Sequence, residues 1–133
     1  MEITSAILFT QDREIINLFS LTASELQMTI VNRQDFASFL LELQEHDYAL
    51  AICDGSKSIS ECLKWVKVIK KMRPKVPLIV ISSEIDKIWG GKLYEERIYH
   101  LCEKPINRDY LKEILSATLS SHGPQNKFSF KGT

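Results

Sequence analysis

The sequence is poor in the residues that mark several classes of protein. Its 133 residues include three cysteines, five glycines and four prolines. The three cysteines, Cys53, Cys62 and Cys102, are odd in number and lack metal-ligand spacing, so we expect buried free thiols in a reducing compartment. The few glycines form no phosphate-binding loop of the G-x-G-x-x-G or P-loop type. These absences argue against a disulfide framework, a zinc site and a nucleotide-binding loop.

Charge of one sign and long apolar runs are also missing. Seventeen Lys and Arg residues balance seventeen Asp and Glu residues, so no net charge attracts nucleic acid or anionic lipid. No apolar run approaches the length of a membrane span. The first residues, 1–4, place no basic segment before an apolar one, unlike a secretory signal. We therefore expect a cytoplasmic protein without direct contact to nucleic acid or membrane.

What is present is enough for one domain. A length of 133 residues suits a single core, and 44% of the residues are hydrophobic. We assign residues 1–121 to that domain. The polar residues 122–133 are expected to form a tail or the start of a linker.

Short apolar runs alternate with segments of helical periodicity. The runs predicted as strands are 3–9, 27–31, 48–53, 76–81 and 98–102. Each is followed by a predicted helix, and the last helix, 107–120, is expected to turn Tyr110, Leu111, Ile114, Leu115 and Thr118 inward. Five such βα units imply right-handed crossovers and a doubly wound parallel sheet. The fold class is therefore α/β, a flavodoxin-like (βα)5 fold with strand order 2-1-3-4-5.

One predicted helix is weak. Residues 84–96 contain Ile85, Ile88 and Trp89 at helical spacing, but Gly90 and Gly91 together cost roughly 2 kcal/mol of helix propensity relative to alanine. We expect a short, broken or mobile helix in this segment.

Three predicted strands end in residues that carry chemistry. Asp54 ends the central strand, Ser82 follows the fourth strand, and Lys104 follows the fifth. Parallel strands bring their carboxyl ends to one edge of the sheet, where open α/β sheets place ligand sites. We expect the acid, the hydroxyl and the lysine to converge there.

In that order and register, Asp54, Ser82 and Lys104-Pro105 resemble the receiver domain of two-component response regulators, over roughly residues 3–120. The resemblance implies that Asp54 is a phosphoacceptor. It further implies that Ser82 binds the incoming phosphoryl group and that Lys104 pairs with that group. Pro105 marks the cis-side loop after the lysine.

The sequence departs from the receiver pattern at the metal site. Receivers usually carry two acids at the end of the first strand, and the matching positions here are Thr10 and Gln11. Asp12, Asp54 and the backbone carbonyl of Ser56 would remain as ligands. Magnesium prefers carboxylates and water in a near-ideal octahedron. Neutral side chains at positions 10 and 11 should therefore weaken magnesium binding severely. The implied cofactor is magnesium if Asp54 is phosphorylated, and none otherwise.

Further departures concern the switch and the surface. Leu101 occupies the position at which receivers commonly place a switch aromatic. Lys57 is either a solvated loop lysine or a second cation near the pocket. Trp89 and Tyr94 belong either to the core or to the face, formed by the fourth helix, fifth strand and fifth helix, that receivers use for output and dimer contacts. The lysines on the helix after residue 58 form either a solvated face or a nucleic-acid patch.

Three hypotheses follow. The first is an atypical receiver, or pseudo-receiver, that acts through protein–protein interaction with weak or no magnesium-dependent phosphorylation. The second is a working receiver, phosphorylated on Asp54 by a histidine kinase or phosphotransfer protein. The third, which the missing glycine loop disfavours, is a flavodoxin-like enzyme or small-ligand binder. We expect a phosphorelay signalling protein that is not an enzyme, with a signalling protein or a second copy of itself as partner.

Overall fold

The computed structural model describes residues 4–83 and 86–121. The predicted tail, 122–133, lies outside the described residues. Strands and helices alternate throughout: β1 (Thr4–Phe9), α1 (Arg13–Glu25), β2 (Met28–Arg33), α2 (Phe36–Glu45), β3 (Leu50–Asp54), α3 (Ile59–Met72), β4 (Leu78–Ser82), α4 (Lys87–Glu95), β5 (His100–Glu103) and α5 (Arg108–Ser121).

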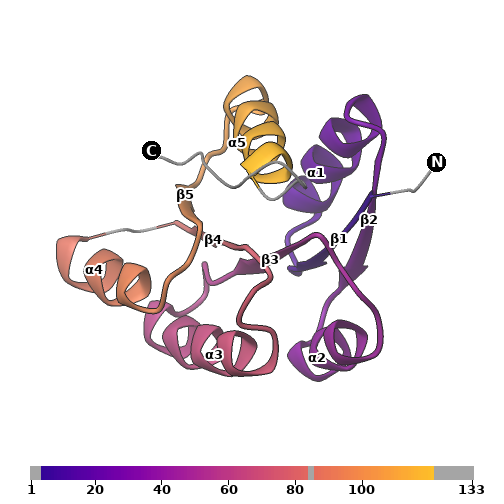
Figure 1. Ribbon diagram of the computed structural model, residues 1–133. Coiled ribbons are helices and arrows are strands. Elements are labelled where there is room, and N and C mark those ends of the chain that lie inside the picture. The colour runs from indigo at the N-terminus through magenta and orange to yellow at the C-terminus, as the bar shows by residue number, and fades with distance from the viewer. Residues whose placement is uncertain (1–3, 84–85, 122–133) are drawn as a thin grey trace.

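The five strands form one parallel sheet in the order β2-β1-β3-β4-β5, as the sequence predicts (Figure 1). β3 lies at the centre and is buried along Leu50–Cys53. The register pairs Phe9 of β1 with Cys53 of β3, so the next residues, Thr10 and Asp54, emerge side by side at the carboxyl edge. The order of strands thus positions the site.

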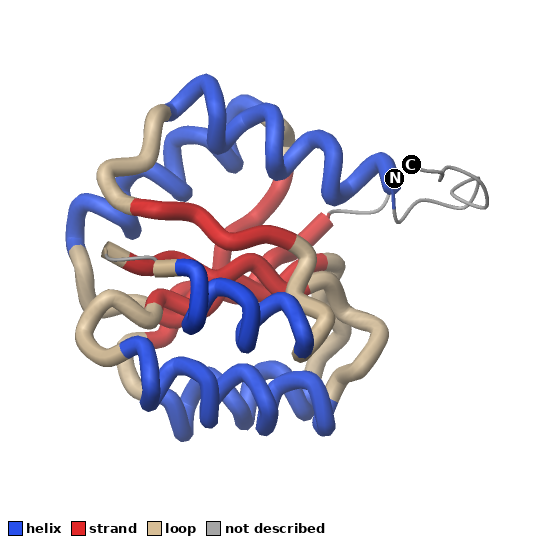
Figure 2. The backbone as a smooth tube through the Cα atoms, turned by 90° about the vertical axis from the view of Figure 1, so that its left-hand side faces the viewer, coloured by secondary structure: helices blue, strands red, loops and turns tan. Residues whose placement is uncertain are grey.

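Helices cover both faces of the sheet, with α1 and α5 on one side and α2, α3 and α4 on the other (Figures 1 and 2). Side chains alternate along each strand, so Ala6 and Leu8 pack toward α1 and α5, while Ile7 and Phe9 pack toward α2 and α3. Because both faces are covered, the strands are nearly continuous runs of apolar residues.

Side-chain caps set where the helices begin. Asp12, Asp35, Ser58 and Asp86 each accept a hydrogen bond from a backbone N–H of the first turn of α1, α2, α3 and α4, respectively. The cap at Asp86 starts α4, which is short and continuous. The two glycines do not break it, and Gly90 is buried.

The contacts of β5 correct the expectation for Tyr110 and decide between the two alternatives for Tyr94. Tyr110 was expected to face inward, but it is 42% exposed and lies 2.5 Å from His100 through its hydroxyl and the Nε2 atom. Tyr94 is 48% exposed, and its hydroxyl accepts a hydrogen bond from the backbone N–H of Leu101 at 3.1 Å. Both tyrosines therefore contact the edge strand β5. Helical periodicity alone does not reveal this contact.

Other expectations about the interior hold. The three cysteines are all buried and free, as predicted. Leu111, Leu115 and Thr118 of α5 are fully buried. No helix among residues 4–83 and 86–121 is long and apolar enough to cross a membrane.

The core under α2 gives a test of this packing. Phe39 is fully buried, whereas Leu41 on the same helix is 56% exposed. We predict that Phe39→Ala lowers the free energy of unfolding by about 3–5 kcal/mol, because it leaves a cavity. Leu41→Ala, the matched control, should change it by less than about 0.5 kcal/mol. Urea unfolding measures both, and equal losses would contradict the packing described.

Candidate functional site

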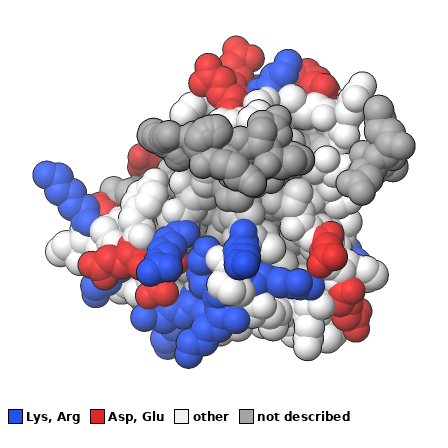
Figure 3. All heavy atoms as spheres, in the orientation of Figure 1, with Lys and Arg blue, Asp and Glu red and all other residues white. Residues whose placement is uncertain are grey.

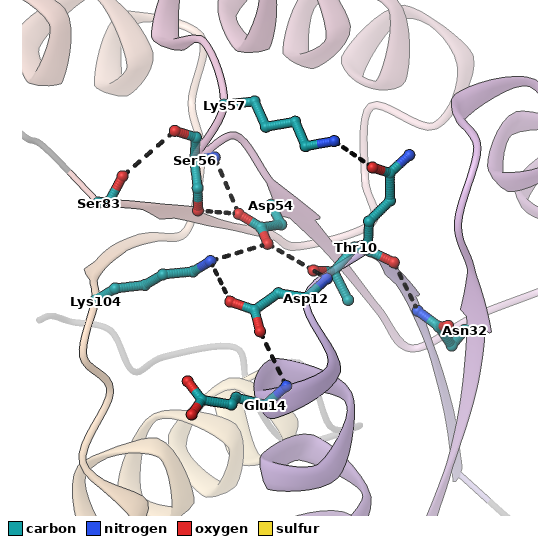
Figure 4. Close-up of polar contacts among 10 residues, drawn as sticks. Thr10, Asp12, Glu14, Asn32, Asp54, Ser56, Lys57, Ser83 and Lys104 are labelled. Carbon is teal, nitrogen blue, oxygen red and sulfur yellow. Dashed lines mark hydrogen bonds and ion pairs between the residues drawn. The ribbon is translucent and has the colours of Figure 1, made fainter.

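The candidate site lies at the carboxyl edge of the sheet, where the ends of β1, β3 and β5 meet (Figure 4). Thr10 follows β1, Asp54 is the last residue of β3, and Lys104 follows β5. Asp12 reaches the same place from the start of α1, whose first turn it caps through Glu14. The structure therefore brings together Asp54, Lys104, Asp12 and Thr10, all of which the sequence singled out.

The Asp54 carboxylate is held by four donors. Oδ1 accepts hydrogen bonds from the backbone N–H of Ser56 at 3.0 Å and from the Ser56 hydroxyl. Oδ2 accepts a hydrogen bond from the Thr10 hydroxyl at 2.6 Å and lies 3.4 Å from the Lys104 ammonium. A carboxylate offers about four lone-pair sites, so these contacts fill them. The Asp54 side chain is also only 7% exposed.

The Lys104 ammonium joins two carboxylates. Its Nζ atom lies 2.7 Å from Asp12 Oδ2 and 3.4 Å from Asp54 Oδ2. The hydrogen bond from Lys104 holds the pKa of Asp12 below its ordinary value of 3.8, against the effect of burial. Burial lowers the pKa of Lys104, but the hydrogen bond to Asp12 and the charge of Asp54 outweigh it and leave that pKa above 10.5. Asp12 and Lys104 are therefore both charged near neutral pH.

Two further contacts cross the site, and the sequence indicated neither. The Lys57 ammonium donates to the side-chain carbonyl of Gln11, which links the β3–α3 loop to the end of β1 (Figure 4). The Ser83 hydroxyl donates to the backbone carbonyl of Ser56 at 3.3 Å. Lys57 is thus a second cation at the pocket, although it is exposed, as a loop lysine is expected to be.

A cavity of about 620 Å³ opens beside Asp54. Phe9, Phe36 and Trp65 form its apolar wall, in which the Phe36 and Trp65 rings stack at 5.3 Å between centroids. Lys57 and Lys104 line its polar side. This wall was not predicted from the sequence, because its rings come from a strand and two helices far apart in the chain.

Gly55 follows Asp54 because the chain has no room there for a side chain. A Cβ atom at this position would lie 2.5 Å from the Cβ of Cys62 and closer still to its sulfur. The backbone N–H of Gly55 donates to the Ile81 carbonyl at 2.7 Å, which fixes the loop next to β4. The glycine thus lets α3 approach the end of β3 closely.

The residues present do not fit a magnesium ion. Thr10 and Gln11 are neutral, the acceptor sites of Asp54 are filled, and Asp12 is paired with Lys104. The Ser56 carbonyl, the third predicted ligand, accepts a hydrogen bond from Ser83. No cluster of three or more His, Cys, Asp or Glu side chains suited to a metal occurs in the described part of the chain. A cation is already present in the form of the Lys104 ammonium.

The other predicted residues lie on β4, on β5 and the turn after it, and on α4. Ser82 is 2% exposed, and its carbonyl accepts the backbone N–H of Lys104 at 2.9 Å. The Lys104–Pro105 peptide bond is cis. Leu101, at the switch position, is half-buried against the core under α3 and α4. Trp89 is half-buried on α4.

Comparison with solved structures identifies the fold. The chain superposes on a response regulator from Thermotoga maritima with a TM-score of 0.83 and 17% identity, over 90% of this chain and 100% of that one. A CheY-like receiver domain protein from Methanospirillum hungatei gives a TM-score of 0.80 and 15% identity, over 90% and 96% of the two chains. An orphan response regulator of H. pylori gives 0.79 and 13%, over 87% and 96%.

No protein-family model matches the chain, and no curated protein sequence matches it. At identities below 25%, likeness to solved structures establishes the fold. The chain has the α/β, flavodoxin-like fold of response-regulator receiver domains, with five parallel strands in the order 2-1-3-4-5.

The charge network makes a pH-dependent prediction. Lys104→Met should lower the free energy of unfolding at about pH 7 by on the order of 1–3 kcal/mol, because it leaves two carboxylates unpaired. Since the folded-state pKa of Asp12 is lowered, this loss should be fully present above the ordinary value of 3.8 and should shrink as the pH falls through the lower folded-state pKa. Since the pKa of Lys104 is raised, the loss should persist up to its ordinary value of 10.5 and disappear above the folded-state pKa.

Urea unfolding of the two proteins between acid and neutral pH measures this difference. Lys87→Met, which removes an exposed lysine at the start of α4, is the matched control. A loss for Lys104→Met that stays constant from neutral to acid pH would contradict the ion-pair network.

Proposed function

We propose that this chain is a receiver-like signalling domain of a two-component system that acts through protein–protein contacts, with weak or no magnesium-dependent phosphorylation of Asp54. The receiver fold supports the general class. The finer proposal is carried by one observation, the Lys104 ammonium in contact with both Asp12 and Asp54.

The chemistry of phosphoryl transfer explains why this observation matters. Transfer to a carboxylate needs an accessible oxygen and a cation that bridges it to the phosphoryl oxygens. In this site both oxygens of Asp54 already accept hydrogen bonds or an ion pair, and its side chain is 7% exposed. A phosphodonor would have to break the hydrogen bond from Thr10 or from Ser56 to Asp54. It would also have to react without the two acids that help to hold magnesium in receivers.

A working receiver is the second candidate. The 3.4 Å approach of Lys104 to Asp54 favours it, because the ammonium stands where it would pair with an acyl phosphate. In that case Asp12 would have to leave Lys104 and bind magnesium together with Asp54. The experiment below separates the two candidates.

The partners proposed are a histidine kinase, a phosphotransfer protein or another signalling protein, and the site of action is the cytoplasm. The face formed by α4, β5 and α5 is the proposed contact surface, suited to a partner or to a second copy of the chain. Its exposed apolar side chains, Ile88, Tyr94 and Tyr110, support that role.

Intact mass after incubation with acetyl phosphate and magnesium tests the proposal. We predict no added phosphate on the folded parent protein, because neither a metal site nor a free oxygen is available at Asp54. Like Asp54→Asn, the control that lacks the nucleophilic carboxylate, the parent should gain no peak with the added mass of a phosphate.

The opposite outcome is equally clear. One phosphate on most of the parent molecules and none on Asp54→Asn would overturn the pseudo-receiver proposal and establish a working receiver. A response-regulator receiver with the usual acids, treated in parallel, confirms that the reagents are active.

A further inference from the structure

The net charge of zero conceals a strong separation of charge along the chain. Residues 62–83 contain six of the seventeen Lys and Arg residues and none of the seventeen Asp and Glu residues. The rest of the chain therefore carries a formal charge of minus six. Figure 3 shows Lys and Arg side chains gathered on the side of the molecule where α3 lies.

Helical spacing aligns three of these lysines. Lys64, Lys67 and Lys71 are three and four residues apart on α3, so they lie on one stripe of the helix. All three are exposed, and the buried residues of α3, such as Val66, occupy the opposite face. We call this stripe the α3 lysine ridge. It is about 10 Å long, at 1.5 Å per residue.

The ridge is only partly neutralised by the protein itself. Lys67 pairs with Glu96 at 3.1 Å. Among the described residues, no carboxylate lies within salt-bridge distance of the Lys64 or Lys71 ammonium. Beside the ridge, burial lowers the pKa of Lys70, and the like charge of Arg97 lowers it further. Positive charges thus crowd together here, and an anionic partner would relieve their repulsion.

We propose that the α3 lysine ridge binds a short acidic segment of a partner protein. The inference rests on the proposed role as an interaction module and names one of its surfaces. Val68, 41% exposed, lies beside the three lysines and offers an apolar contact for a protein segment. The ridge therefore suits carboxylates that flank an apolar side chain.

Acidic residues at the borders of the ridge favour a short peptide over an extended polyanion as its ligand. Glu61 lies in the first turn of α3, and Glu96 lies at the end of α4, so acids border the ridge at one end and along one side. A long nucleic acid or a membrane surface would meet these acids as well as the lysines. The tryptophan rings of α3 and α4 already have partners within the protein. Trp65 stacks on Phe36, and the Lys92 ammonium lies over the ring of Trp89. They do not offer the open stacking surface that single-stranded nucleic acid uses.

Fluorescence anisotropy with the full chain tests the ridge. The probe is a labelled glutamate-rich peptide with a central leucine, and the same peptide with glutamine for glutamate is the uncharged control. We expect saturable binding at about 0.05 M salt that weakens about tenfold at about 0.3 M salt, because salt screens exposed charges. The variant Lys64→Glu/Lys71→Glu should weaken binding by about tenfold or more, since rim charges steer association.

A matched variant guards against general charge effects. Arg13→Glu/Lys87→Glu reverses two exposed cations on other helices and should leave the affinity within about twofold. If the charge-reversed ridge variant fails to fold, Lys64→Gln/Lys71→Gln replaces it. Circular dichroism establishes the fold of every variant.

Three results would overturn the inference. These are the absence of saturable peptide binding, equal losses in the ridge and control variants, and equally tight, ridge-dependent binding of a single-stranded oligonucleotide or of phosphatidylglycerol vesicles. The outcome is separable from that of the phosphorylation test. A phosphorylated Asp54 would overturn the proposed function, whereas a peptide that does not bind would remove only the ridge.

Discussion

The structure of the site depends on the Lys104 ammonium, which joins Asp12 and Asp54 across the carboxyl edge of the sheet. Asp12 and Lys104 are 92 positions apart, so this contact connects the beginning of the fold to its last βα unit. Without a cation, two carboxylates at this edge would repel each other. The lysine therefore supplies within the protein a positive charge that receivers usually complement with magnesium.

The surrounding residues are consistent with a site that is complete in itself. Thr10 and Ser56 donate to the Asp54 carboxylate, and Lys57 and Gln11 close a second contact above it. Replacing two acids with a threonine and a glutamine thus does more than remove metal ligands. It turns one position into a hydrogen-bond donor toward Asp54, which favours a fixed arrangement over a site that opens to a phosphodonor.

The sequence predicted the strand order from its five alternating βα units. It predicted the convergence of Asp54 with Lys104 because each follows an apolar run whose carboxyl end lies at the same edge of the sheet. It did not predict the Thr10–Asp54 hydrogen bond, which depends on the register of β1 against β3. The prediction that Tyr110 faces inward was wrong. Helical periodicity does not show that this part of α5 lies beside β5, the edge strand of the sheet, where the ring is partly exposed. The wall of Phe9, Phe36 and Trp65 was missed for a similar reason, since it forms only when three elements pack together.

Magnesium titration by calorimetry tests the central claim most directly, namely that the protein's own lysine replaces the metal. The parent protein should show no saturable binding at millimolar magnesium. Thr10→Asp/Gln11→Asp, which restores the two acids, should gain binding by at least about tenfold, because each added carboxylate near the ion contributes several kcal/mol of gross attraction. Saturable binding by the parent that Asp54→Asn abolishes would contradict the account.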